Sequence, residues 1–342
     1  MQHEITQAIP LLDEQGELTQ PGWARRLLPV YDRSRVRGGP LRLKERDCYL
    51  VMNRQCSLSL TISDHRDMGM ASISLIDPWE GWQVTRSPMR LMPLGGTGLP
   101  QSSLRGSCAR AGRGYGLLFQ HEGEGRTLHA HMDRFRDGQA LDAQILLTQE
   151  PEESIVMCTP FEKPGQFYFN QKINCMRAQG KVTLGDREYV FDPEDSFAVL
   201  DWGRGVWTCR GTWYWGSASG MVDGVPFGFN IGYGFGDTSA ATENALFYGG
   251  KLHKLSQVTF HIPRKNGREH YLAPWTFDSD DRRVRMKFRP ILDRAACPSA
   301  GVVRSGQHQV FGSFTGTAVL DDGTAVRLKE LLGFAEKVDD RW

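Results

Sequence analysis

The feature that most constrains the fold is a set of turn dipeptides that separate short alternating segments. Five such dipeptides occur along the chain: Asp137-Gly138, Asp223-Gly224, Gly249-Gly250, Asn266-Gly267 and Asp322-Gly323. Their residues accept the positive φ angles that tight hairpins require. The segments between them alternate apolar and polar residues, as in Thr127–Phe135 and Val284–Phe288, which predicts strands with one buried face. The pattern therefore indicates an all-β, antiparallel protein.

The length of 342 residues suits two β-domains rather than one. Only two short segments look helical, 21–28 and 239–247, and the second is equally compatible with a strand. A boundary is expected near 150–165, where acidic residues and Pro/Gly pairs interrupt the strand pattern. We therefore expect two antiparallel β-barrels or sandwiches side by side, with few short helices. The expected division is an N-terminal extension with a short helix at 1–40, a first barrel-like half at 41–160 and a second at 161–342.

The balance of charge and the absence of known motifs exclude several classes of function. The 41 Lys and Arg residues against 40 Asp and Glu leave a formal charge of +1, so a nucleic-acid partner is not expected. No apolar run suits a membrane helix or a signal peptide, and seven cysteines without a Cys-x-x-Cys pair fit a reduced, cytoplasmic setting. The chain lacks a P-loop, a zinc-protease helix and a dinucleotide fingerprint, so we expect neither a cofactor nor a metal site.

Tryptophan gathers in one stretch of the sequence, DWGRGVWTCRGTWYW. Four of the nine tryptophans fall within fourteen residues there: Trp202, Trp207, Trp213 and Trp215. Arg204 is bracketed by these indoles and follows Asp201 closely, so a stacked guanidinium paired with a carboxylate is expected. One interpretation is architectural, a barrel end filled by aromatic rings and an Asp–Arg pair. The other is that Asp201 is a general acid or base in an aromatic-lined cavity, with Arg204 tuning its pKa.

A second group of polar residues is embedded in the Gly-rich and aromatic-rich segment 228–255. Glu243 offers a second carboxylate for catalysis, and three further residues are candidates for ligand binding: Asn230, Asn244 and His253. The alternative is a loop hydrogen-bond network that rigidifies a hairpin. Lys172 and Glu336 lie on other strands, and we interpret both as solvated strand residues.

Several separated motifs resemble one bacterial family. They are DWGRGVW, GYGFGDTSAATENALF followed by GGKLHKL, APW, VFGSFTG and GFAEKVDDRW. Together they resemble the family described as domain of unknown function 2804, over the range from about Leu43 to Trp342. This resemblance implies a family but no activity.

More remotely, GKVTLGDREYVFDPEDSFAVLDWGRGVW is similar to a passage of the carotenoid hydratase and tocopherol cyclase-like proteins. The resemblance implies tandem lipocalin-like (calycin-like) barrels and an isoprenoid- or lipid-like ligand. Asp201 matches the aspartate of that passage, whereas Trp202 follows it directly and Gly203-Arg204-Gly205 replaces the rest of the motif.

Three hypotheses about function follow from these features. The leading one is a protein that binds a large apolar small molecule in an aromatic-lined cavity and catalyses a metal-independent hydration, isomerisation or cyclisation through Asp201. The second is a carbohydrate-active protein with Trp stacking and Asp201 and Glu243 as paired carboxylates. The third is a non-catalytic lipid carrier. The sequence leaves open whether the protein is an enzyme, and it does not indicate an oligomeric state.

Overall fold

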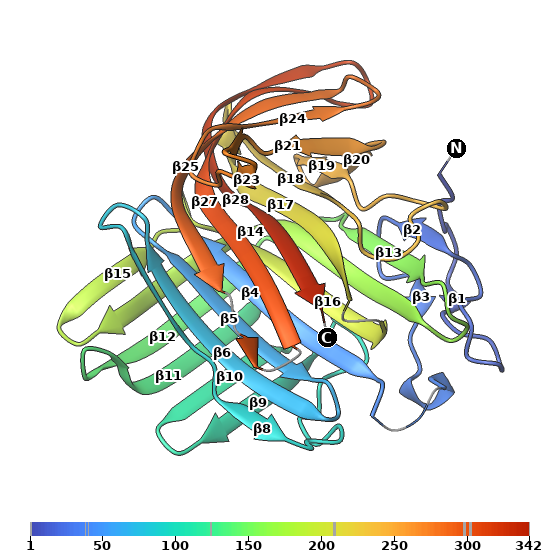
Figure 1. Cartoon of the computed structure of the whole chain (residues 1–342), viewed down its shortest axis with the longest axis horizontal. Helices are drawn as coiled ribbons and strands as arrows, with labels where there is room; N and C mark the ends of the chain where they lie inside the picture. Colours follow the sequence, from blue (N-terminus) through green and yellow to red (C-terminus); the bar gives the residue numbers. More distant parts are fainter. Residues whose placement is uncertain are drawn as a thin grey trace.

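The computed structural model describes residues 2–37, 39, 41–123, 125–207, 210–296, 299–300 and 303–341 (Figure 1). Within these ranges the chain is built of β-strands, and the one helix is the 3-10 turn η1 (Arg33–Arg35). The helix expected at 21–28 is wrong, because Gly22–Ala24 forms a strand instead. No helix of the described part is long and apolar enough to cross a membrane.

The first sheet holds fourteen strands within the described residues, and all pairs that form it are antiparallel. Its main path runs β7-β6-β5-β4-β16-β14-β12-β11-β10-β9. Its strands are β2 (Gly22–Ala24), β4 (Lys44–Met52), β5 (Ser57–Asp64), β6 (Met68–Asp77), β7 (Trp82–Arg86), β8 (Met89–Leu91), β9 (Gly106–Gly112), β10 (Tyr115–His121), β11 (Arg126–Arg136), β12 (Gln139–Thr148), β13 (Ile155–Pro160), β14 (Phe167–Leu184), β15 (Arg187–Phe191) and β16 (Phe197–Val206).

The second sheet holds ten strands within the described residues, in the main order β20-β19-β18-β17-β28-β27-β25-β24-β21. These strands are β17 (Arg210–Val222), β18 (Val225–Tyr233), β19 (Ala245–Tyr248), β20 (Lys251–Lys254), β21 (Val258–His261), β24 (Trp275–Ser279), β25 (Val284–Ala296), β26 (Ser299–Ala300), β27 (Val303–Val319) and β28 (Ala325–Arg341). Two small ribbons complete the fold: β1 (Ile9–Pro10) with β3 (Pro29–Val30), and β22 (Arg264–Lys265) with β23 (Arg268–Glu269).

The chain passes from the first sheet to the second between Val206 and Arg210. The divisions expected at residues 40 and 160 stay a prediction. Five of the seven cysteines lie in the described residues and are free thiols. Cys209 and Cys297 lie outside the described residues.

The turn dipeptides form hairpins as the sequence predicts. Asp137-Gly138 joins β11 to β12 with φ angles of 52° and 80°, and Asp223-Gly224 joins β17 to β18 with 49° and 79°. Both residues of each pair therefore have positive φ, which is the geometry of the tight turn that matches strand twist. The all-β, antiparallel fold class is confirmed, and it follows from these local turns and the alternation between them.

Each sheet curls around an apolar core of its own. In the first, side chains such as Leu60, Phe119 and Trp202 are completely or almost completely buried. In the second, Phe229, Phe288 and Phe314 fill the interior. The pocket beside Trp202 measures only about 20 Å³, because side chains occupy the inside of the first sheet. The inside of the first sheet therefore leaves little free space beside Trp202.

The outer faces of the two sheets pack against each other, and Figure 1 shows β25, β27 and β28 crossing over β4 and β5. An apolar cluster holds this contact together, with members from both sheets: Leu50, Met52, Ile76, Val199, Leu292, Phe311 and Phe334. The long strands are therefore buried on both faces where they cross.

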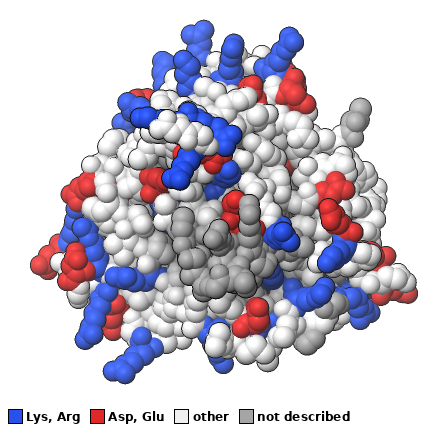
Figure 2. Space-filling model, in the orientation of Figure 1, with Lys and Arg blue, Asp and Glu red and all other residues white. Residues whose placement is uncertain are grey.

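Figure 2 shows a solvent surface on which Lys and Arg are interspersed with Asp and Glu, in keeping with the formal charge of +1.

Replacing Phe334 by alanine tests this contact. Phe334 is completely buried between the sheets and meets Trp215 edge-on with ring centroids 4.7 Å apart. Phe334→Ala should lower the free energy of unfolding by about 3–5 kcal/mol, because it leaves a cavity, whereas Phe334→Leu should cost less than about 1.5 kcal/mol. Urea denaturation measures both values. A loss below about 1 kcal/mol for the alanine variant would contradict a tightly packed contact.

Candidate functional site

A pocket of about 310 Å³ lies between the outer faces of the two sheets, next to the apolar cluster that joins them. The first sheet contributes residues of β4, β5, β6, β14 and β16, and the second contributes residues of β17, β25, β27 and β28. Its wall combines aromatic rings with ionisable side chains: Arg46, His65, Tyr168, Lys172, Asp201, Trp207, Trp213, Trp215, Phe235, Glu243, Arg294, Glu336 and Asp340. The volume lies at the small end of the range for ligand pockets in proteins.

Asp201 stands at the centre of the wall formed by the first sheet. It pairs in register with Lys172 on β14 and with Cys48 on β4, and it is 1% exposed. Lys172 Nζ donates to Asp201 Oδ1 over 2.6 Å, and Arg46 forms an ion pair with the other carboxylate oxygen. The Tyr168 hydroxyl lies 3.5 Å from Oδ1. One carboxylate is therefore shared by two cations and a phenol.

These neighbours decide the protonation state of Asp201. Burial pushes the pKa of this carboxyl upward, because it disfavours the charged form. The charges of Arg46 and Lys172, together with hydrogen bonds from Lys172 and Tyr168, act in the opposite direction and outweigh burial. The pKa of Asp201 therefore lies below its ordinary value, and the group is ionised at neutral pH.

Glu336 faces the same pocket from the second sheet and has quite different neighbours. Its Oε2 accepts hydrogen bonds from the side-chain amides of Gln307, over 3.1 Å, and Gln309, over 2.9 Å. No carboxylate–cation pair of Glu336 within 4.0 Å occurs among the described residues. Burial raises the pKa of Glu336 above its ordinary value, and the hydrogen bond from Gln307 together with the charges of Arg294, Arg46 and Lys172 only partly opposes this. The pocket thus holds two carboxyl groups with pKa values displaced in opposite directions.

Aromatic rings form the rest of the wall. Lys172 Nζ lies 4.1 Å from the centre of the Trp215 ring, so a cation of the first sheet rests on an indole of the second. The Phe235 ring meets Tyr168, Trp207 and Trp213 edge-on, with centroids 4.9 to 6.1 Å apart. The pocket therefore presents apolar ring surface directly beside the charged groups.

The pocket wall also contains a buried polar atom that has no hydrogen-bond partner among the described residues, on His65. His65 Nε2 is buried and makes no hydrogen bond to the described residues. Burial and the nearby charges of Lys44 and Arg46 lower the pKa of His65 to about 4, so the ring is neutral at neutral pH. Such an atom is free to bond a ligand or a water molecule.

Five of the residues expected to form a site come together in this pocket: Asp201, Glu243, Trp207, Trp213 and Trp215. Trp213 and Trp215 share one face of β17, as the alternation predicts. Asn230 does not line the pocket but supports it, since it accepts from Trp215 Nε1 over 2.7 Å and donates to Glu243 over 2.9 Å. It is a positioning residue for both side chains.

Trp202 and Arg204 point away from the pocket, into the first sheet. The guanidinium of Arg204 lies 4.2 Å from the Trp202 ring centre, and it pairs with Asp47 over 2.8 Å. The pairing of Arg204 with Asp201 that the sequence suggested is wrong. Residues 201 and 204 are an odd number of positions apart on one strand, so their side chains leave opposite faces.

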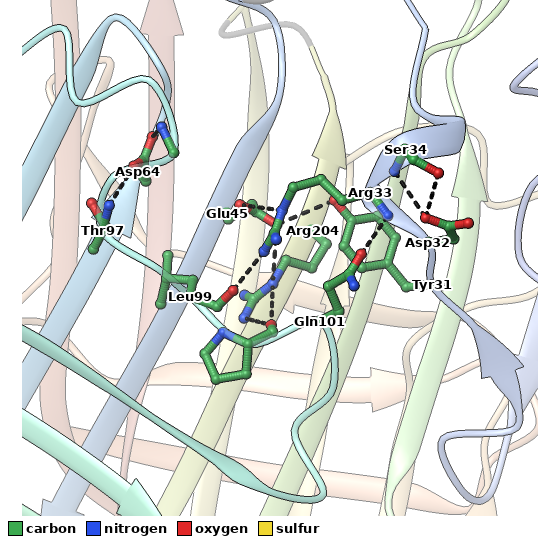
Figure 3. A network of polar contacts seen from close by, with 12 residues as sticks. Tyr31, Asp32, Arg33, Ser34, Glu45, Asp64, Thr97, Leu99, Gln101 and Arg204 are labelled. Carbon is green, nitrogen blue, oxygen red and sulfur yellow. Dashed lines mark hydrogen bonds and ion pairs between the residues drawn. The ribbon is translucent and has the colours of Figure 1, made fainter.

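The surroundings of Arg204 form a structural network (Figure 3). The guanidinium of Arg204 donates to the carbonyl of Pro100, which lies on the segment after β8. Its Nε lies 3.7 Å from a carboxylate oxygen of Glu45. Glu45 also accepts hydrogen bonds from Tyr31 and Arg33, whose dashed contacts Figure 3 draws. The network connects the N-terminal segment, through Tyr31 and Arg33, and the segment around Pro100 to strands β4 and β16. Arg204 is thus explained by architecture.

Asn244 and His253 also lie outside the pocket. Asn244 accepts from the backbone N–H of Gly232 and donates to the carbonyl of Ser256, so it organises the loop around β19. His253 does not line the pocket, and its Nδ1 lies 3.3 Å from a carboxylate oxygen of Asp321. The hydrogen bonds of Asn244 fit the loop-network interpretation. Within the described ranges, no cluster of three or more His, Cys, Asp and Glu side chains is placed to hold a metal ion.

The interpretation of Lys172 and Glu336 as solvated strand residues is wrong. They are 4% and 5% exposed. The sequence holds a signal that would have found Glu336, because Phe334 and Ala335 are both apolar and precede it on opposite faces of the strand. Apolar residues on both faces are typical of a strand buried on both sides, and a charge on such a strand needs a partner or a function.

Replacing Glu336 by glutamine tests its protonation state. Because the folded-state pKa of Glu336 is raised above 4.5, ionising it costs free energy only in the folded protein. The stability of the parent protein should therefore fall relative to Glu336→Gln as pH rises from about 4.5 through the raised pKa. Melting temperatures over a pH series measure this difference, which should grow and then level off.

Glu330→Gln provides the matched control, because Glu330 lies on the same strand with its side chain 67% exposed. Its difference from the parent should not grow in this way. A pH-independent difference for Glu336→Gln would contradict the raised pKa.

Comparison with solved structures places the fold among known proteins. A protein of Nitrosomonas europaea, provisionally described as an AttH, superposes with a TM-score of 0.51 at 13% identity, over 90% of this chain and 95% of that one. CghA with Sch210972 gives 0.49 at 12% identity, over 96% and 97%. Kievitone hydratase of Nectria haematococca gives 0.46 at 10% identity, over 97% and 98%. The first of these similarities shows a shared fold and carries nothing about activity.

Comparison by sequence gives the family. No curated protein matches the chain. The model of the family described as "Domain of unknown function (DUF2804)" matches residues 2–342, which extends the range of about Leu43 to Trp342 expected from the motifs. Because the family model matches the chain over residues 2–342, the chain belongs to the DUF2804 family.

Proposed function

We propose that the protein is an enzyme that transfers protons to and from a small molecule in the pocket between the two sheets. One observation carries the proposal: Asp201 and Glu336 face the same pocket from different sheets, and their surroundings displace their pKa values in opposite directions. A pair of carboxyl groups separated in this way supplies a neutral acid and an ionised base at one pH.

The roles of the two groups follow from their neighbours. Glu336, whose pKa is raised above its ordinary value by burial, donates a proton to the ligand. Asp201 stays ionised between Arg46 and Lys172 and accepts a proton. In a hydration, Glu336 protonates one carbon of a double bond, water adds to the other, and the proton lost by that water passes to Asp201. Isomerisation and cyclisation use the same two transfers without a net gain of water.

The aromatic wall supports an apolar ligand. Trp213 and Trp215 from β17, together with Trp207, offer π-faces and ring edges to a hydrocarbon or ring skeleton. The same faces stabilise positive charge that develops on carbon during protonation, as Trp215 already does for the ammonium of Lys172. The proposed substrate is thus an unsaturated, lipid- or isoprenoid-like molecule with a polar group.

The test is activity-based and uses Glu336→Gln. A small-molecule extract of the source cells is incubated with the parent protein or with the variant, and untargeted mass spectrometry follows every compound. The parent should convert a compound to an isomer or a water adduct. Glu336→Gln should slow this conversion by about 100- to 10,000-fold, the usual contribution of a general acid. It should do so with its fold intact, because an amide resembles the neutral carboxyl.

Glu330→Gln is the control and should convert the compound at the parent rate. Asp201→Asn is a less selective test, since it leaves Arg46 and Lys172 without their shared carboxylate and also lowers stability. If the parent retains a lipid in native mass spectrometry but converts nothing, the protein is a carrier. If Glu336→Gln converts at the parent rate, Glu336 is not the acid.

A further inference from the structure

Arg294 is the one arginine of the pocket wall that has no carboxylate partner among the described residues. It lies on β25, and its Nη1 donates to Gln309 Oε1 over 2.8 Å. No ion pair of Arg294 within 4.0 Å occurs in the described part of the chain. A guanidinium carries five N–H donors, so most of its hydrogen-bonding capacity is unused.

Three other arginines with buried or partly buried partners are paired with a carboxylate. Arg46 binds Asp201, Arg126 binds Glu150 and Arg204 binds Asp47. Burial lowers the pKa of Arg294 below its ordinary value, and the electrostatic influence of nearby Glu336 and Cys48 only partly opposes this. No nitrogen atom of the Arg294 guanidinium is both buried and without a hydrogen-bond partner. The unused donors therefore remain accessible from the pocket.

The nearest carboxyl does not fill this role. Gln309 bridges the two groups, because it accepts from Arg294 and donates to Glu336 over 2.9 Å. Glu336 has a raised pKa and is neutral in the proposed mechanism. The other carboxyl groups of the wall are engaged as well: Asp201 with its two cations, Glu243 with Asn230, and Asp340 with a partner of its own.

We infer that Arg294 binds a carboxylate group of the ligand, so that the substrate is an acid with an apolar skeleton. A planar guanidinium and a planar carboxylate form two parallel hydrogen bonds, which matches the free donors of Arg294. Bound there, the carboxylate lies on the second sheet beside Glu336, while the skeleton extends along the tryptophans toward Asp201. This inference rests on the proposed function, because it names the substrate class for the same pocket.

The experiment compares two probes of nearly identical shape, 2-naphthoate and 2-naphthamide. Quenching of intrinsic tryptophan fluorescence and calorimetry measure the dissociation constant of each for the parent protein. The carboxylate should bind about 10- to 100-fold more tightly than the amide, the usual effect of a hydrogen-bonded charge pair. This comparison needs no variant, so it does not depend on how a variant folds.

Arg294→Met should remove the preference for the carboxylate, and Arg294→Lys should keep part of it. Arg289→Met is the matched control, because Arg289 lies on the same strand with its side chain 65% exposed, and it should keep the full preference. Equal affinities, tighter binding of the amide, or no binding of either probe to the parent would overturn the inference. So would a preference that survives in Arg294→Met, because Arg46 or Lys172 would then hold the anion.

Binding is measured without turnover, so this result is separate from the fate of the proposed chemistry. A carboxylate preference together with an active Glu336→Gln variant would support the substrate class and refute the acid. Equal binding of the two probes together with an inactive Glu336→Gln variant would support Glu336 as the acid and refute a carboxylate-containing substrate.

Discussion

Burial of the central strands on both faces is the constraint on which the rest of the structure depends. All ten residues of β16 are buried, because one face packs inside the first sheet and the other against the second sheet. Consecutive side chains of a strand point to opposite faces, so each position is assigned either to a core or to the contact between the sheets. Charged residues on such strands are left without solvent, and each needs a partner.

The protein meets this need differently on the two faces. Inside the first sheet, Arg204 pairs with Asp47 and lies over Trp202. Between the sheets, pairing is incomplete. Asp201 pairs with two cations, Glu336 accepts hydrogen bonds from two amides, and Arg294 donates to one amide oxygen. Charged side chains with close partners of opposite charge are typical of structural networks. Charged side chains with perturbed pKa values beside a cavity are typical of binding and catalytic sites.

Local sequence predicts much of the fold and part of the site. The turn at Asp137-Gly138 and the shared face of Trp213 and Trp215 follow from residues that are neighbours in the chain. The burial of Lys172 and Glu336 does not, because it depends on which strands cross when two distant halves of the chain pack together. The incorrect pairing of Arg204 with Asp201 has a different origin, because alternation along their shared strand is enough to place the two side chains on opposite faces.

The central claim is that neighbouring groups displace the two carboxyl pKa values in opposite directions around one pocket. Carbon-13 NMR titration of the side-chain carboxyl groups measures this most directly, with Glu336→Gln and Asp201→Asn used to assign the two resonances. The account predicts that Glu336 titrates above the ordinary glutamate value and Asp201 below the ordinary aspartate value. Ordinary values for both groups, or an Asp201 that titrates above Glu336, would contradict it.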